Sequence, residues 1–158
     1  MTDIKLQTPP GCVWLAQGHD FLVYGDHDYV YIKHSDGRTW DIGGMYGNAV
    51  AALITWDERY AVIVGCGIMI CDLERFGEKV TEGESWSKTP VAHLMAEPDI
   101  LFESGKTWWF NDVEQVSADE YISEIRLATA LTDVHVGIYS LNPQTFEFRP
   151  VPHGEPIR

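Results

Sequence analysis

Two short clusters of His and Asp residues near the N-terminus are candidates for metal chemistry. His19-Asp20 precedes an apolar run, and Asp26-His27-Asp28 follows it. Imidazole and carboxylate groups together bind transition metals, whereas hard cations take clustered carboxylates. The spacing of a calcium-binding loop is absent, and Asp residues at a hairpin often cap their own turn. The clusters therefore predict structural turns first, and a small metal-dependent hydrolase only as an alternative.

Motifs for nucleophilic catalysis and phosphate binding are missing. The sequence has no G-x-S-x-G elbow, and its six His residues lie outside zinc-protease motifs. Gly65-Cys66-Gly67 places a thiol at a hairpin turn, but the nearest basic residue in sequence is Arg59, so activation is not expected. Three cysteines without a Cys-x2-Cys pair indicate reduced thiols and no zinc. We predict no enzymatic activity and no cofactor.

The charge balance limits the class of partner. A net charge of −13 and a pI of about 4.6 argue against binding to nucleic acids or anionic lipid. The same charge favours a basic protein partner. The N-terminus lacks the pattern of a signal peptide, and the longest mostly apolar stretch, residues 60–71, is too short to span a bilayer. These observations predict a cytoplasmic location.

The acidic excess is concentrated in one part of the chain. Residues 72–124 carry 13 acidic and four basic residues, and the segment 74–88 is strongly polar. Trp86 is isolated within that segment, and aromatic anchors ringed by charge are typical of protein interfaces. The alternative is a solvated acidic loop that maintains solubility. The predicted partner-binding residues are Trp86, Glu82, Glu84, Glu78, Asp26, Asp28 and Glu103.

Four similar segments recur along the chain. Each is a short apolar run, a polar turn and a second apolar run, and the second runs begin at Phe21, Tyr60, Ile100 and Val134. A third run begins eight residues after the second in the first three units and 12 residues after it in the fourth. These runs are rich in β-branched and aromatic residues, as strands are. The pattern predicts an all-β chain of antiparallel strands.

Units of about 40 residues with three or four strands resemble the blades of β-propeller repeat proteins. Ile68-Met-Ile-Cys-Asp-Leu73 and Trp108-Trp-Phe-Asn-Asp-Val113 are similar to the ends of WD-type blades, although the Gly-His dipeptide and a Trp-Asp end are missing. The resemblance implies a small, degenerate four-bladed propeller in a single domain, 1–158. The expected repeats are 13–48, 49–90, 91–123 and 124–152.

Two segments leave alternatives open. Residues 3–7 alternate polar and apolar, and we expect them to form a strand that closes the last blade, since closure removes an open sheet edge. Ser117-Ala-Asp-Glu120 resembles a capping box, and the apolar spacing that follows is compatible with a helix over 118–131. That helix would make the chain an α+β domain. Ring closure within one chain, or between two chains of a homodimer, is also open.

Three functional hypotheses remain. In size and charge the chain is similar to bacterial immunity proteins, which implies an acidic inhibitor that blocks the cationic site of a basic toxin or nuclease. The second hypothesis is a carbohydrate-binding propeller, because sugars stack on aromatic faces. However, Trp14, Tyr31 and Trp108 fall within strand runs, which favours a place in the core. The metal-dependent hydrolase is the third.

Overall fold

The computed structural model describes residues 6–45, 47–76, 91–94, 108–117, 123–131 and 135–151, with side chains for all of these except 91–94. This part of the chain is all-β, as predicted, with one short 3-10 helix, η2 (Leu73–Arg75). No helix among the described residues is long and apolar enough to cross a membrane. The strands are β1 (Val13–Gln17), β2 (Phe21–Asp26), β3 (Tyr29–His34), β4 (Thr39–Gly44), β5 (Ala51–Ile54), β6 (Tyr60–Gly65), β7 (Gly67–Asp72), β8 (Val91–Leu94), β9 (Phe110–Ser117), β10 (Ser123–Thr129), β11 (Ile138–Leu141) and β12 (Phe148–Pro150).

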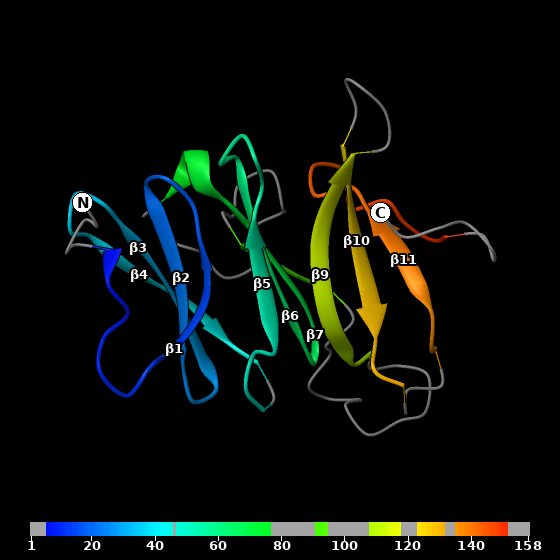
Figure 1. Ribbon diagram of the computed structural model, residues 1–158, viewed down its shortest axis with the longest axis horizontal. Coiled ribbons are helices and arrows are strands. Elements are labelled where there is room, and N and C mark those ends of the chain that lie inside the picture. The colour runs from blue at the N-terminus through cyan, green and yellow to red at the C-terminus, as the bar shows by residue number, and fades with distance from the viewer. Residues whose placement is uncertain are drawn as a thin grey trace.

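The strands form three four-stranded antiparallel sheets (Figure 1). The first sheet contains β1 to β4, the second β5 to β8 and the third β9 to β12, and each strand pairs with its sequence neighbour. Short turns that contain Gly, Asp or Asn make such meanders possible. β1 contacts β5, and β5 contacts β9, so the three sheets stack in chain order.

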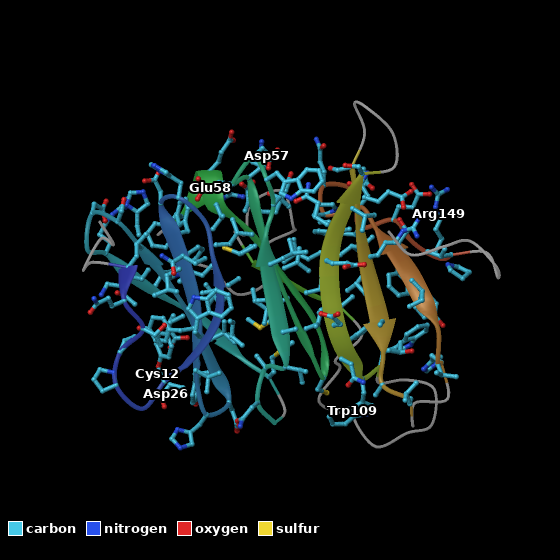
Figure 2. All side chains as sticks on the ribbon, in the orientation of Figure 1. Cys12, Asp26, Asp57, Glu58, Trp109 and Arg149 are labelled. Carbon is cyan, nitrogen blue, oxygen red and sulfur yellow. The ribbon has the colours of Figure 1, made fainter. Side chains whose placement is uncertain are left out.

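The turns gather at two ends of the stack. The upper end, as drawn in Figures 1 and 2, carries the turns 18–20, 35–38, 55–59 and 142–147. The lower end carries the β2–β3 turn, residues 47–50 ahead of β5, the β6–β7 turn, and residues 130–131 and 135–137 between β10 and β11. Side chains on these turns can therefore meet only when their turns share an end.

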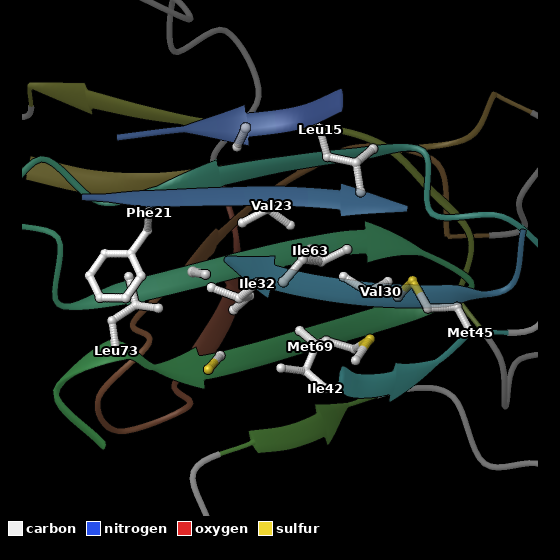
Figure 3. Packing of buried hydrophobic residues seen from close by; sticks show 13 residues of the cluster. Leu15, Phe21, Val23, Val30, Ile32, Ile42, Met45, Ile63, Met69 and Leu73 are labelled. Carbon is white, nitrogen blue, oxygen red and sulfur yellow. The ribbon is translucent and has the colours of Figure 1, made fainter. Parts of the chain in front are cut away.

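The second sheet is covered on both faces, and this explains its sequence. Every residue of β6 and β7 is buried, because alternate side chains enter two different cores. Ile63 and Met69 pack against Val23 and Ile32 of the first sheet (Figure 3). On the opposite face of the second sheet, the core shared with the third sheet contains Val62, Val64, Ile68, Ile70, Phe110, Val113, Ile125 and Leu127.

The alternative helix over 118–131 is wrong for the described residues 123–129, which form β10. Ile125 and Leu127 enter the core beside Val62, whereas Arg126 points to the other face of the sheet. Successive side chains that point to opposite faces are the pattern of a strand, and the burial of Ile125 and Leu127 in one core overrides the helical spacing. Residues 118–122 lie outside the described part of the chain.

The strands depart from the predicted repeat units after residue 90. β8 was expected to open a third unit, but it pairs with β7 as the fourth strand of the second sheet. Trp108–Phe110 leads directly into β9, the first strand of the third sheet. The repeated feature of the sequence is a pair of apolar runs joined by a turn, which forms one hairpin. Such a pair can lie anywhere in a four-stranded sheet, so it does not mark the residue at which a sheet begins. A closed ring of four blades stays a prediction.

The predicted closing strand falls mostly on residues 3–5, which lie outside the described residues. Leu6 is buried and packs against Leu22 and Tyr24 of the first sheet, and Leu6 and Gln7 belong to no strand. The described end of this segment therefore covers the first sheet.

Candidate functional site

The five His and Asp residues of the alternative metal site do not lie together. His19 and Asp20 lie on the β1–β2 turn at the upper end, whereas Asp26, His27 and Asp28 lie at the lower end. The six-residue strand β2 separates them, a length of roughly 20 Å at about 3.3 Å per residue. The two clusters flank the same strand at opposite ends, so they cannot bind one ion together.

At the upper end, His19 and Asp20 meet a residue that sequence reasoning missed. Ligand atoms of His19, Asp20 and Glu58 lie within 4.8 Å of one another. The Glu58 Oε1 atom accepts a hydrogen bond from the Asp20 backbone N–H at 2.9 Å, and Asp20 accepts one from the Ser35 hydroxyl at 3.2 Å. A Cβ atom at Gly18 would lie 2.5 Å from Glu58 Oε1. These contacts join turns of the first and second sheets, which is a structural role.

Of the predicted partner-binding residues, the structure describes two. Asp26 and Asp28 flank the β2–β3 turn at the lower end (Figure 2 labels Asp26). His27 between them has a positive φ of 55°, and its Nδ1 lies 2.8 Å from Asp26 Oδ1. The other five, Glu78, Glu82, Glu84, Trp86 and Glu103, lie outside the described residues.

Asp26 belongs to an array of aromatic side chains on the first sheet. In β2, Val23 enters the core, so its neighbours Leu22 and Tyr24 point to the outer face, away from the second sheet. Tyr24 is the cross-strand partner of Trp14 on one side and of Tyr31 on the other. The aromatic–acidic face, as we call this array, comprises Trp14, Tyr24, Tyr29, Tyr31, Asp26 and Asp41.

The register brings acids and rings together on this face. Asp26 is the cross-strand partner of Tyr29, and Asp41 is that of Tyr31. The rings of Tyr24 and Tyr31 stack with centroids 5.3 Å apart. Burial first, and then the carboxylates of Asp41 and Asp26, raise the pKa of Tyr31. Negative charge therefore acts on the rings themselves, which makes the face favourable for a cation.

Two rings of the face are open to solvent. Trp14 is 56% exposed and Tyr29 54% exposed, whereas Tyr24 is buried. The expectation that Trp14 lies in the core is wrong, because its strand β1 is the first in its sheet and its ring points to the outer face. Trp108 packs against the core as expected, and its ring stacks on His135 with centroids 3.7 Å apart.

Exposed apolar side chains gather at the lower end. Of the eight large hydrophobic residues exposed in the described part of the chain, only Trp56 lies at the upper end. The seven at the lower end are Val13, Trp14, Tyr29, Val50, Trp109, Leu131 and Val136.

Basic residues have the opposite distribution. Lys33, Arg38, Arg59 and Arg75 lie at or near the upper end, and Arg126 and Arg149 lie within strands of the third sheet. Asp26 and Asp28 thus lie at an end to which the described residues contribute no Lys or Arg. Exposed apolar residues and the carboxylates of Asp26 and Asp28 therefore lie at the same end.

Cys66 is not placed to act as a nucleophile. It is buried in the β6–β7 turn, where its backbone pairs with that of Trp109 in an isolated antiparallel β-bridge. Burial raises the pKa of its thiol. Cys12 lies beside the aromatic–acidic face, and burial followed by the Asp26 carboxylate raises its pKa too. Both thiols are therefore protonated at neutral pH, the unreactive form.

No protein-family model, curated protein or solved structure matches this chain. The geometry of the aromatic–acidic face and of the lower end therefore carries the functional argument alone.

Proposed function

We propose that the protein is a non-enzymatic binding domain that docks a cationic protein segment on its aromatic–acidic face. The observation that carries this proposal is the exposure of Trp14 and Tyr29 beside the carboxylate of Asp26. Exposed Trp side chains are enriched among the residues that anchor protein interfaces. A Trp that contributed only to folding would be expected in the core.

The face matches the chemistry of Lys and Arg side chains. A cation over a Trp or Tyr ring gains about 0.5–1 kcal/mol at an exposed site and about 2 kcal/mol when desolvated. Asp26 and Asp41 can each accept a charge-assisted hydrogen bond from the same partner. The apolar residues Val13 and Val50 at the lower end would cover the aliphatic parts of the segment.

The charge of the whole chain supports the same kind of partner. A net charge of −13 accelerates encounter with a basic protein and rejects acidic ones. A second copy of the chain is a poorer occupant. The outward face of the third sheet carries Asp112, Glu114 and Glu124 around Arg126 and Arg149, so joining it to the first sheet would bring acidic faces together.

We propose that the three sheets are successive blades of a propeller-like stack. The support is that each sheet is a four-stranded meander and that the first strands, β1, β5 and β9, contact one another in order. Within this scheme, an inhibitor of a basic toxin or nuclease is the narrower form of the proposed function. Glu78, Glu82, Glu84, Trp86 and Glu103 would then extend the acidic surface.

Affinity capture from lysate of the source cell tests the proposal. The baits are the wild type, Trp14→Ala, Asp26→Asn and Trp86→Ala, each at low and high salt. We expect a basic protein that the wild type retains, that salt releases and that Trp14→Ala and Asp26→Asn lose. Loss with Trp86→Ala alone would move the site to the acidic segment 74–88. If all three variants retained the basic protein, neither the aromatic–acidic face nor the segment 74–88 would be its binding site.

A further inference from the structure

A polar groove lies at the upper end, far from the aromatic–acidic face. It has a volume of about 350 Å³ and lies between the β5–β6 turn and the third sheet. Thr55 and Asp57 line one wall, Gln115 and Ser123 line the other, and Gln144 borders it from the β11–β12 turn. The volume falls within the range of about 300–1,000 Å³ that is typical of small-molecule sites.

Hydrogen bonds hold the polar groups of the groove in place. The Trp56 backbone N–H donates to Gln115 Oε1 at 2.8 Å, and Gln115 Nε2 donates to the Ser123 hydroxyl at 2.9 Å. The orientation of the Gln115 amide is thus fixed, because both of its ends have a partner. An amide nitrogen carries two hydrogens, and a hydroxyl can both donate and accept. Gln115 Nε2 and the Ser123 hydroxyl can therefore each form a further hydrogen bond to a ligand.

The charges that line the groove are already compensated. Glu124 lies 3.1 Å from Arg126, and Glu147 lies 3.8 Å from Arg149. Asp57 accepts hydrogen bonds from the Thr55 hydroxyl at 2.7 Å and from the Arg59 N–H at 3.0 Å. Glu124 and Glu147 are each paired with an Arg, whereas Asp57 is held by neutral donors, so an anionic ligand would be repelled by these carboxylates. A cationic ligand would compete with Arg126 and Arg149 for Glu124 and Glu147, and spermine tests for such binding below. A neutral ligand rich in hydroxyl groups meets neither obstacle.

Trp56 gives the groove an aromatic neighbour. It lies in the sequence between the two lining residues Thr55 and Asp57, and it is 63% exposed. It is the single large exposed hydrophobic residue that the described part of the chain places at the upper end. An indole presents a flat apolar surface on which the C–H face of a sugar ring can stack.

We infer that this groove binds a neutral saccharide. Gln115, Ser123 and Gln144 supply hydrogen bonds to its hydroxyl groups. Trp56 does not line the groove, but its backbone N–H is bonded to the lining residue Gln115, so its exposed indole can stack on a sugar ring that extends beyond the groove. The site is separate from the aromatic–acidic face in position and in ligand chemistry, and it does not depend on the proposed docking of a basic protein.

Saturation-transfer NMR with four neutral disaccharides tests the inference. The probes are maltose, cellobiose, lactose and N,N′-diacetylchitobiose, each titrated to about 10 mM so that a Kd of millimolar order is visible. We expect at least one of them to bind the wild type. Trp56→Ala and Gln144→Ala should each weaken that binding about tenfold, since about 1.4 kcal/mol corresponds to a factor of ten.

Two controls separate this site from the proposed docking face. Trp14→Ala removes the other Trp that is more than half exposed in the described part of the chain, and it should leave saccharide binding unchanged. Gln144 is exposed on a turn, so Gln144→Ala remains informative if Trp56→Ala perturbs the β5–β6 turn. The inference would be overturned if no disaccharide bound, if Trp56→Ala and Gln144→Ala both bound the saccharide as tightly as the wild type, or if Trp14→Ala lost the binding. It would also be overturned if the groove bound the polycation spermine and none of the saccharides.

Discussion

Thr55 shows how one side chain can organise a turn that the sequence marks only as polar. It is buried, and its hydroxyl accepts the Tyr60 N–H at 3.0 Å and lies 2.7 Å from Asp57 Oδ1. The same Asp57 oxygen accepts the Arg59 N–H. The turn therefore contains an ionised carboxylate that stabilises it, and this predicts a specific dependence on pH.

Asp57 should contribute to acid unfolding. The Thr55 hydroxyl first, and then the Arg59 N–H, lower the pKa of Asp57 despite partial burial. The stabilisation is therefore complete above the unfolded Asp pKa of about 3.9 and is lost as the pH falls through the lower folded pKa. We expect Asp57→Asn to lower the urea midpoint at pH 7 and to approach the wild type as the pH falls through the folded pKa. A gap between the two proteins that is constant with pH would refute this role.

Gly18 should be required because of one contact. A Cβ at this position meets Glu58 Oε1 at 2.5 Å, and moving Glu58 breaks its hydrogen bond from the Asp20 N–H. We expect Gly18→Ala to lower the free energy of unfolding by about 1 kcal/mol. In a Glu58→Ala background most of that cost should disappear. Equal costs in the two backgrounds, measured by urea unfolding, would show that the contact is unimportant.

At the scale of elements, the position of a strand in its sheet decides what its residues do. Trp14 and Trp108 both lie in aromatic-rich runs, and sequence reasoning placed both in the core. β1 is the first strand of its sheet and directs Trp14 outward, whereas Trp108 packs with His135, Tyr139 and Phe148. Periodicity predicts a strand but not which face of it will be covered, since that depends on the neighbouring sheet.

The two Trp residues should therefore respond differently to truncation. Trp108→Ala removes a ring that packs on three aromatic neighbours and should cost about 3 kcal/mol. Trp14→Ala removes a ring that is 56% exposed and should cost under about 1 kcal/mol. Thermal unfolding of both variants measures this difference. Similar losses of stability would contradict the exposure of Trp14.

The whole molecule is organised around its second sheet. The apolar runs of β6 and β7 are continuous, which predicted strands, and they are continuous because both faces of the sheet are covered. The stacking of the sheets could not be predicted in the same way. The apolar run of β8 resembles the runs that open the other predicted repeat units, so the sequence pattern assigns it to a third unit. In the structure β8 pairs with β7 and completes the second sheet.

Adjacent residues of β6 should report on both cores. Ile63 faces the first sheet and Val62 the third, and both are fully buried. We expect Ile63→Ala to cost about 3 kcal/mol and Val62→Ala about 2 kcal/mol. Each should shift one cooperative transition, because the second sheet links the other two. Two separate transitions in urea would show instead that the sheets unfold independently.

The aromatic–acidic face is built from residues that the sequence identifies only in part. Asp26 and Asp28 were predicted from their charge. The contribution of Trp14 and Tyr29 appears only in the register of β1, β2 and β3, because cross-strand neighbours are distant in sequence. The face must therefore be tested by its preference for a cationic ligand.

The most direct test is an NMR titration with a short peptide of alternating Lys and Leu, followed at the Trp14 indole N–H and, in all proteins including Trp14→Ala, at the backbone amide of Tyr29. We expect saturable binding that salt weakens, at least tenfold loss with Trp14→Ala or Asp26→Asn, and no binding of the peptide in which Glu replaces Lys. Asp36→Asn, at the upper end, is the matched control and should bind like the wild type. If the Trp14 signal does not move, or the Glu peptide binds equally well, the face does not bind cationic segments.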